Sequence, residues 1–114
     1  MTTPNHTLRE LSEAPSSVVH RVTVETGDTW DPTTVSLAVL QVSKPDGTTV
    51  TWSATMSEKT ATGLTLTHPL AVGGTDVPLG SKGQLWSVKP KLTLPGGVLY
   101  ARPVAISIIG SFDF

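Results

Sequence analysis

Histidines, aspartates and tryptophans are the residues of this chain whose side chains could bind a metal or a ligand. The three histidines, His6, His20 and His68, are too far apart to form any short metal-binding motif. Asp28 and Asp31 share one loop, but calcium needs about six to eight oxygen ligands and the loop lacks the acidic positions of an EF-hand. We therefore expect no metal and no cofactor, and we expect the rings of His20 and His68 to face water from strands.

Catalytic motifs are absent from the sequence. It contains no Gly-x-Ser-x-Gly elbow, no phosphate-binding loop and no His-Glu-x-x-His motif. Paired carboxylates could serve a glycosidase, but most of the nine acidic residues fall in turns, and a domain of this size offers little cleft. We expect no catalytic residue and no enzymatic activity.

Three tryptophans in a chain with few other aromatic residues invite a carbohydrate-binding interpretation, because sugar rings stack on indole faces. Trp52 and Trp86 are in register with apolar neighbours on predicted strands, which favours core packing for both. Trp30 lies in a loop and is the tryptophan that we expect to contact a partner.

The composition predicts one domain and excludes several partners. The chain has 114 residues, a net charge of -1 and a charged fraction of 15%, below the roughly 25% of average soluble domains. Its eight basic residues are scattered singly, so we expect no binding to nucleic acid or to an anionic membrane. Cysteine is absent, which excludes a disulfide framework and a thiolate zinc site. No apolar run approaches the roughly 20 residues that span a bilayer, and we expect synthesis in the cytoplasm without a secretion signal.

Residues 35–56 predict a β-hairpin. The first arm alternates Val35, Leu37 and Val39 with small residues, and the second alternates four apolar residues, from Val50 to Met56, with Ser and Thr. Between the arms, Lys44-Pro45-Asp46-Gly47 has the residues of a type I turn closed by a glycine in the left-handed conformation.

Further strands are predicted at residues 18–25, 64–68, 84–94 and 98–109, with an irregular stretch at 70–83. In the last strand we place Val98 and Tyr100 on the apolar face with Ile106 and Ile108. Pro90 and Pro103 lack the backbone donor of a ladder, so each predicts an edge strand or a bulge.

The predicted fold class is therefore all-β, an antiparallel β-sandwich of six to seven strands, with a small β-barrel as the alternative. We divide the chain into an N-terminal arm at residues 1–17, a domain at 18–110 and a tail at 111–114. In the arm, Leu8 and Leu11 have the spacing of one face of a short helical turn.

The turn motifs resemble those of a known group. Small bacteriophage virion proteins, whose nearest named relative is the N-terminal immunoglobulin-like domain of phage baseplate upper proteins, are similar in four stretches: Gly27-Asp28-Thr29, Lys44-Pro45-Asp46-Gly47-Thr48, Leu94-Pro95-Gly96-Gly97 and Pro103-Val104. The resemblance implies an immunoglobulin-like docking module without catalysis. The chain departs from the group in the longer stretch between Asp76 and Trp86 and in ending at Phe114, which would make it a complete subunit rather than a fibre adaptor.

We therefore expect a structural protein of a bacteriophage virion, an accessory subunit of the tail, neck or baseplate that docks on other virion proteins in a symmetric assembly. A capsid decoration (cement) protein and a carbohydrate-binding module are the alternatives. The candidate partner-binding residues are Leu8, Leu11, Trp30, Phe112 and Phe114. The four residues outside the Trp30 loop lie beyond the predicted strands, so they are expected either to dock on partners or to fold back on their own sandwich.

Overall fold

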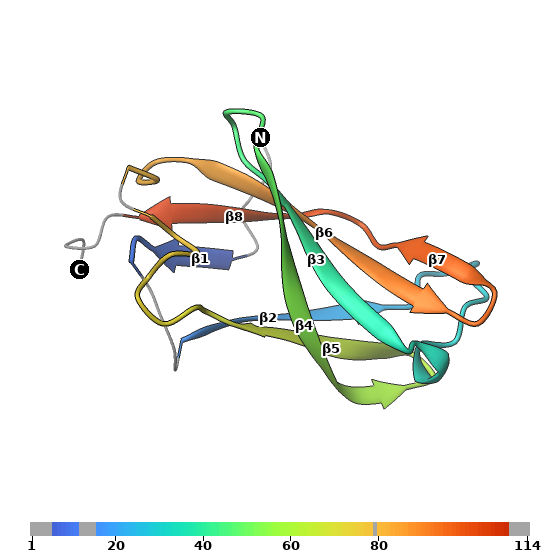
Figure 1. The fold of residues 1–114 in the computed structure, drawn as a ribbon. Helices are drawn as coiled ribbons and strands as arrows, with labels where there is room; N and C mark the ends of the chain where they lie inside the picture. Colours follow the sequence, from blue (N-terminus) through green and yellow to red (C-terminus); the bar gives the residue numbers. More distant parts are fainter. Residues whose placement is uncertain (1–5, 12–15, 79, 110–114) are drawn as a thin grey trace.

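The computed structural model describes residues 6–11, 16–78 and 80–109, and these residues form an all-β fold (Figure 1). One short 3-10 helix, η1 (Pro32–Thr34), interrupts the strands. Within the described residues, none of the helical structure is long and apolar enough to cross a membrane. The strands are β1 (His6–Arg9), β2 (Ser17–Thr23), β3 (Leu37–Ser43), β4 (Thr49–Thr60), β5 (Gly63–Pro69), β6 (Leu85–Leu94), β7 (Gly97–Tyr100) and β8 (Val104–Ile109).

The strands form one sheet in the order β1-β8-β6-β3-β4-β5-β2, and β7 pairs with β6 off this path. β4 takes part in both layers of the fold. Its residues 49–54 pair with β3, and its residues 55–60 pair with β5. The sheet therefore folds over on itself into a nearly closed, barrel-like shape (Figure 1). The all-β prediction is confirmed, and the closure fits the barrel alternative. Among the strands of the described residues, all pairs are antiparallel except β1 with β8, which run parallel.

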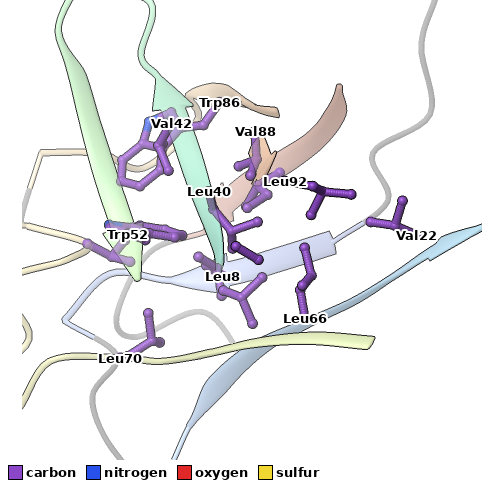
Figure 2. Packing of buried hydrophobic residues seen from close by; sticks show 14 of the residues in the cluster. Leu8, Val22, Leu40, Val42, Trp52, Leu66, Leu70, Trp86, Val88 and Leu92 are labelled. Carbon is purple, nitrogen blue, oxygen red and sulfur yellow. The ribbon is translucent and has the colours of Figure 1, made fainter. Parts of the chain in front are cut away.

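The hydrophobic core lies between the two sides of this folded sheet (Figure 2). Trp86 is fully buried and Trp52 nearly so, with their ring centroids 6.3 Å apart, which confirms the prediction that both are core residues. Burial alternates along β2, β5 and β6, as a sheet with one covered face requires. The other fully buried large side chains are Leu40, Leu64, Leu66, Leu70, Leu92, Ile106, Ile108, Val35, Val42, Val77 and Val88.

The predicted turn of the central hairpin is confirmed. The Gly47 N–H donates to the Lys44 carbonyl over 3.0 Å, and Gly47 has φ of +90°. One carboxylate oxygen of Asp46 accepts from both the Thr48 N–H and the Thr48 hydroxyl, at 2.9 and 2.6 Å, and these bonds lower the pKa of Asp46. The turn is therefore defined by interactions among neighbouring residues.

The predicted facing of the first hairpin arm is wrong. Leu40 lies opposite Trp52, and residues directly opposite in an antiparallel pair share a face, so the even-numbered residues of β3 point inward. Leu37 is 57% exposed as a result, while Val35 is buried just before the strand begins. Both faces of this arm carry apolar residues, so alternation alone did not determine which face is buried.

The predicted strand at 98–109 is two strands, because the ladder is interrupted at residues 101–103. Val98 and Tyr100 consequently lie on the outer face of β7, contrary to the prediction, whereas Ile106 and Ile108 are buried in β8 as expected. Pro103 lies in this interruption.

Pro90 lies in β6, which has neighbours on both sides, so the predicted edge strand is wrong for this proline. Its carbonyl accepts from the Ala101 N–H over 2.9 Å. The nitrogen and carbonyl of one strand residue point to the same side. The Pro90 nitrogen, which has no N–H to donate, therefore points to the side of β6 where β8 and β7 pair. β8 pairs with β6 up to Val88 and β7 pairs from Lys91, so Pro90 lies between the two ladders and no ladder bond is lost.

The described part of the predicted arm belongs to the sheet. His6 lies opposite Ile106 in the parallel pair of β1 with β8, and Leu8 is only 8% exposed within the core. The expected helical turn is wrong, because β1 is extended and Leu11 then takes a positive φ of 61°. The Leu11 N–H donates to the Val77 carbonyl. A strand paired over four residues explains why Leu8 is buried in this chain's own core.

We predict that Gly47→Val destabilises the protein by about 1–2 kcal/mol, since a side chain at this φ is strained even though nothing lies within 4 Å of the added Cβ. Gly96→Val is the matched control, because Gly96 also faces open space and has no positive φ. Chemical denaturation of both variants measures the difference. Equal losses of stability would contradict a strained backbone at Gly47.

Candidate functional site

A groove of about 440 Å³ lies between β2 and the segment that connects β7 to β8. One wall is made by residues 20–23 of β2, and the opposite wall by residues 99–102 and Val104. The loop after β2 contributes Glu25, Asp28 and Trp30. We call this site the seam groove, because it lies where the two ends of the folded sheet approach each other.

Among the described residues, β1 covers only part of the seam, and the seam groove lies in the remainder. β1 and β2 are the two ends of the sheet path, and β1 pairs with β8 over residues 106–109 alone. The first residue of β1 meets β2 through its side chain: His6 Nε2 lies 3.4 Å from His20 Nδ1, and the rings are edge to face. His20 and Val104 also line the groove, so the groove begins where β1 begins.

Trp30 is half-buried and packs against the core while it lines the seam groove. The aspartates on either side of it shape its loop. Asp28 donates its N–H to the Glu25 carbonyl over 2.9 Å, and an Asp31 carboxylate oxygen accepts from the N–H and hydroxyl of Thr33 at 3.0 and 2.7 Å. The bonds from Thr33 lower the pKa of Asp31. The Asp28 carboxylate accepts in turn from the Glu25 N–H over 3.3 Å, so both carboxylates hold the loop that positions the indole.

Charged side chains lie along the rim of the seam groove. Arg102 Nη2 lies 2.9 Å from Glu25 Oε2, so this ion pair joins the two walls. Both side chains are more than half exposed, so the pair contributes little to stability. The Arg21 guanidinium turns to the outer surface instead, where it donates to the Glu58 carbonyl and the Thr65 hydroxyl at 3.0 and 3.1 Å.

His68 occupies a second polar site, which the sequence interpretation missed. The ring was expected to face water, but His68 is buried and stacks on Trp52 with centroids 4.6 Å apart and planes 6° apart. Its Nδ1 lies 2.8 Å from the Ser53 carbonyl oxygen and its Nε2 3.0 Å from Asp76 Oδ2. The signal was available, since His68 continues the inward alternation of Leu64 and Leu66.

The His68 site is suited to structure rather than proton transfer. Nδ1 faces a carbonyl oxygen and Nε2 faces a carboxylate oxygen, and both of these oxygens are hydrogen-bond acceptors. The same Asp76 oxygen accepts from the Ala71 N–H over 2.9 Å. Because both ring nitrogens are engaged, neither is available as a general base. The site ties the loop after β5 to β4.

The other candidate partner-binding residues differ in their positions. Leu8 is buried in the core, which makes it unavailable to a partner, whereas Leu11 is 43% exposed. Phe112 and Phe114 lie outside the residues that the structure describes. Across residues 6–11, 16–78 and 80–109, no group of three or more His, Cys, Asp or Glu side chains is arranged to hold a metal ion.

An apolar surface lies on the outer side of β3, β6 and β7. Cross-strand register places Leu37 beside Thr93 and Thr93 beside Val98, and the next row runs from Val39 through Lys91 to Tyr100. Leu37, Val98 and Tyr100 are each more than half exposed. The three strands are adjacent in Figure 1. We call this surface the outer apolar face.

Asp76→Ala is expected to destabilise the protein by about 3 kcal/mol, because it leaves the enclosed His68 ring and the Ala71 N–H without their partner. Glu25→Ala removes the exposed carboxylate at the seam groove and should change the free energy of unfolding by less than about 1 kcal/mol. Urea denaturation compares the two. A small loss for Asp76→Ala would show that the His68 site does not hold the loop.

Stability should also fall with decreasing pH below about 6.5. Burial lowers the pKa of His6, and burial followed by the nearby His6 lowers the pKa of His20. The unfolded chain then binds more protons than the folded one, so the free energy of unfolding declines as pH falls through the unfolded value of 6.5. The double variant His6→Gln, His20→Gln should show a shallower decline between about pH 7 and 5. An unchanged slope would exclude the pair as its source.

Comparisons of this chain with protein-family models, with curated proteins and with solved structures found no match.

Proposed function

We propose that this chain is a non-enzymatic structural protein of a bacteriophage particle, an accessory subunit of the tail, neck or baseplate that docks on other virion proteins. The resemblance to virion proteins rests on turn residues. Three of those stretches are turns in this fold. The Asp28 N–H donates to the Glu25 carbonyl across Gly27, and Gly47 closes the β3–β4 hairpin. Pro95 and Gly96 lie between the paired residues Leu94 and Gly97. This agreement supports the immunoglobulin-like relationship from which the proposal begins.

The outer apolar face is the observation that carries the docking function. Leu37, Val98 and Tyr100 leave apolar surface in water, and burying such surface against a partner gains about 25 cal/mol per Å². Lys91 and Thr93 lie between them and would hydrogen-bond at the same interface. A charged fraction of 15% agrees with a subunit that buries much of its surface in permanent contacts.

The arrangement of the titratable groups supports a role without catalysis. His68 is held at both ring nitrogens, and His6 and His20 contact each other at the seam. Asp28 and Asp31 cap the turns of one loop. In the described residues, then, the side chains best suited to acid–base chemistry make structural contacts.

A carbohydrate-binding module is the second candidate, and one observation favours it. Trp30 and Tyr100 line the same groove, and Glu25, Asp28 and Arg102 at its rim could hydrogen-bond sugar hydroxyls. Capsid decoration differs from the leading proposal in the place of the subunit on the particle. The docking surface would be the same in both.

Val98→Lys should reduce incorporation into phage particles by about tenfold or more, since a charge buried without a partner weakens an interface strongly. Val72→Lys is the matched control, because Val72 is 80% exposed in a loop away from the outer apolar face. A phage lacking the gene is complemented with each variant, and the copies per purified particle are measured by quantitative mass spectrometry. Equal incorporation of the two variants, or absence of the wild-type chain from particles, would contradict the proposal.

A further inference from the structure

We propose that the seam groove receives an extended peptide segment of a partner subunit, which adds to the sheet as a strand along the free edge of β2. The inference rests on the proposed docking function and names how the partner is held. Tyr100 borders both the seam groove and the outer apolar face. The variants that test them, Thr23→Pro and Val98→Lys, each change only one of these surfaces, so each proposal can fail without the other.

The backbone of β2 is the first observation that supports strand addition. Val24 donates its N–H to Thr62, on the β5 side, and β2 continues this register with Val22 opposite Leu64. In an antiparallel pair alternate residues bond to the neighbour, so the backbone groups of Arg21 and Thr23 point away from β5. Their edge faces the seam groove, where it has no paired strand within the described residues.

The second observation is that the same seam already contains an extended segment. β1 occupies it beside residues 106–109 and begins at His6, which contacts His20. The open part continues from His20 to Thr23, a length of about 13 Å for four residues of strand. A partner segment placed there would therefore continue along the space in which β1 lies.

The opposite wall suits a strand with alternating side chains. Ala101 bonds to Pro90 of β6, so the backbone groups of Tyr100 point away from β6. Leu99, Val104 and Trp30 are partly buried apolar residues around the groove, and they would receive inward-pointing apolar side chains. The Arg102–Glu25 ion pair is exposed, so opening it to admit a peptide costs little.

A peptide fits these observations better than a sugar does. A stacking platform for sugar needs an open indole face, whereas Trp30 is half-buried against the core. An unpaired strand edge offers donors and acceptors at the spacing of another polypeptide backbone. The occupant is thus a segment of about four or more residues, with small apolar side chains at alternate positions.

The probe is the synthetic peptide Lys-Thr-Val-Thr-Val-Thr-Glu, blocked at both ends. It is titrated into the full chain while tryptophan fluorescence is followed. In an antiparallel pairing its two valines would lie opposite Val22 and His20, and the threonines that flank the first valine would lie opposite Thr23 and Arg21. Binding should be saturable and should slow hydrogen exchange at the Arg21 and Thr23 amides. A peptide with proline in place of the three threonines should not bind, because proline cannot donate to a ladder.

Thr23→Pro removes a donor that points into the groove while the β5 side of β2 is kept, and it should weaken peptide binding about tenfold. Val19→Pro is the matched control on the same edge but outside the groove, and it should bind as the wild type does. Melting temperatures of both variants establish that they are folded.

Saturable binding lost in Thr23→Pro and kept in Val19→Pro would support strand addition. Three results would overturn it: no binding by the threonine–valine peptide, equal binding by the proline peptide, or equal effects of the two variants. Saturable binding of a cell-surface glycan that Trp30→Ala abolishes and Thr23→Pro leaves unchanged would assign the groove to sugar instead. Loss of particle incorporation in Val98→Lys with no peptide binding would overturn only the groove proposal.

Discussion

A sheet that folds over on itself without full closure must end in two strands, and this constraint determines the surface of the protein. The two end strands are β1 and β2, which approach each other through His6 and His20. Backbone donors and acceptors at such edges need water or another strand as partner. In the part of the chain that the structure describes, β1 spans only His6–Arg9 and leaves part of the seam uncovered. The groove, its ion pair and the free edge of β2 all lie there.

A polar junction at the buried His68 connects the two sides of the folded sheet within a largely apolar core. Trp52 on β4 stacks on His68 of β5, and Asp76 from the following loop bonds to the ring. An aromatic stack and two hydrogen bonds fix the relative position of the strands more narrowly than aliphatic packing does. The junction therefore adds geometric precision where β4 passes from one side of the fold to the other.

Features with local causes could be predicted from the sequence. The Lys44–Thr48 turn depends on proline, aspartate and glycine acting on their own backbone, and the inward faces of β2 and β6 follow from one-sided alternation. The facing of β3 could not be predicted in this way, because apolar residues occupy both of its faces. The pairing of Leu40 with Trp52 on the neighbouring strand determines which face of β3 is buried, and this pairing is a tertiary contact.

Features that join distant segments were beyond pattern reasoning. The burial of Leu8 requires β8, which lies at the other end of the chain, and four residues carry too little periodicity to indicate a strand. Trp30 was identified as a surface candidate, but the groove around it needs residues 99–104 on the far side of the seam. His68 is different, because its alternation with Leu64 and Leu66 indicates burial in spite of the polar ring.

The parallel pairing of β1 with β8 also imposes an order on how the protein is made. The central hairpin is local and forms within microseconds, but β1 has no sheet partner until residues 106–109 have been synthesised. At about 5–20 residues per second, the first strand waits roughly 5 to 20 s for its partner. During that interval the apolar side of Leu8 and the future neighbours of β8 are open to other chains. Fast completion of synthesis therefore protects this fold from mispairing, and the meeting of its two ends is the step that closes the core.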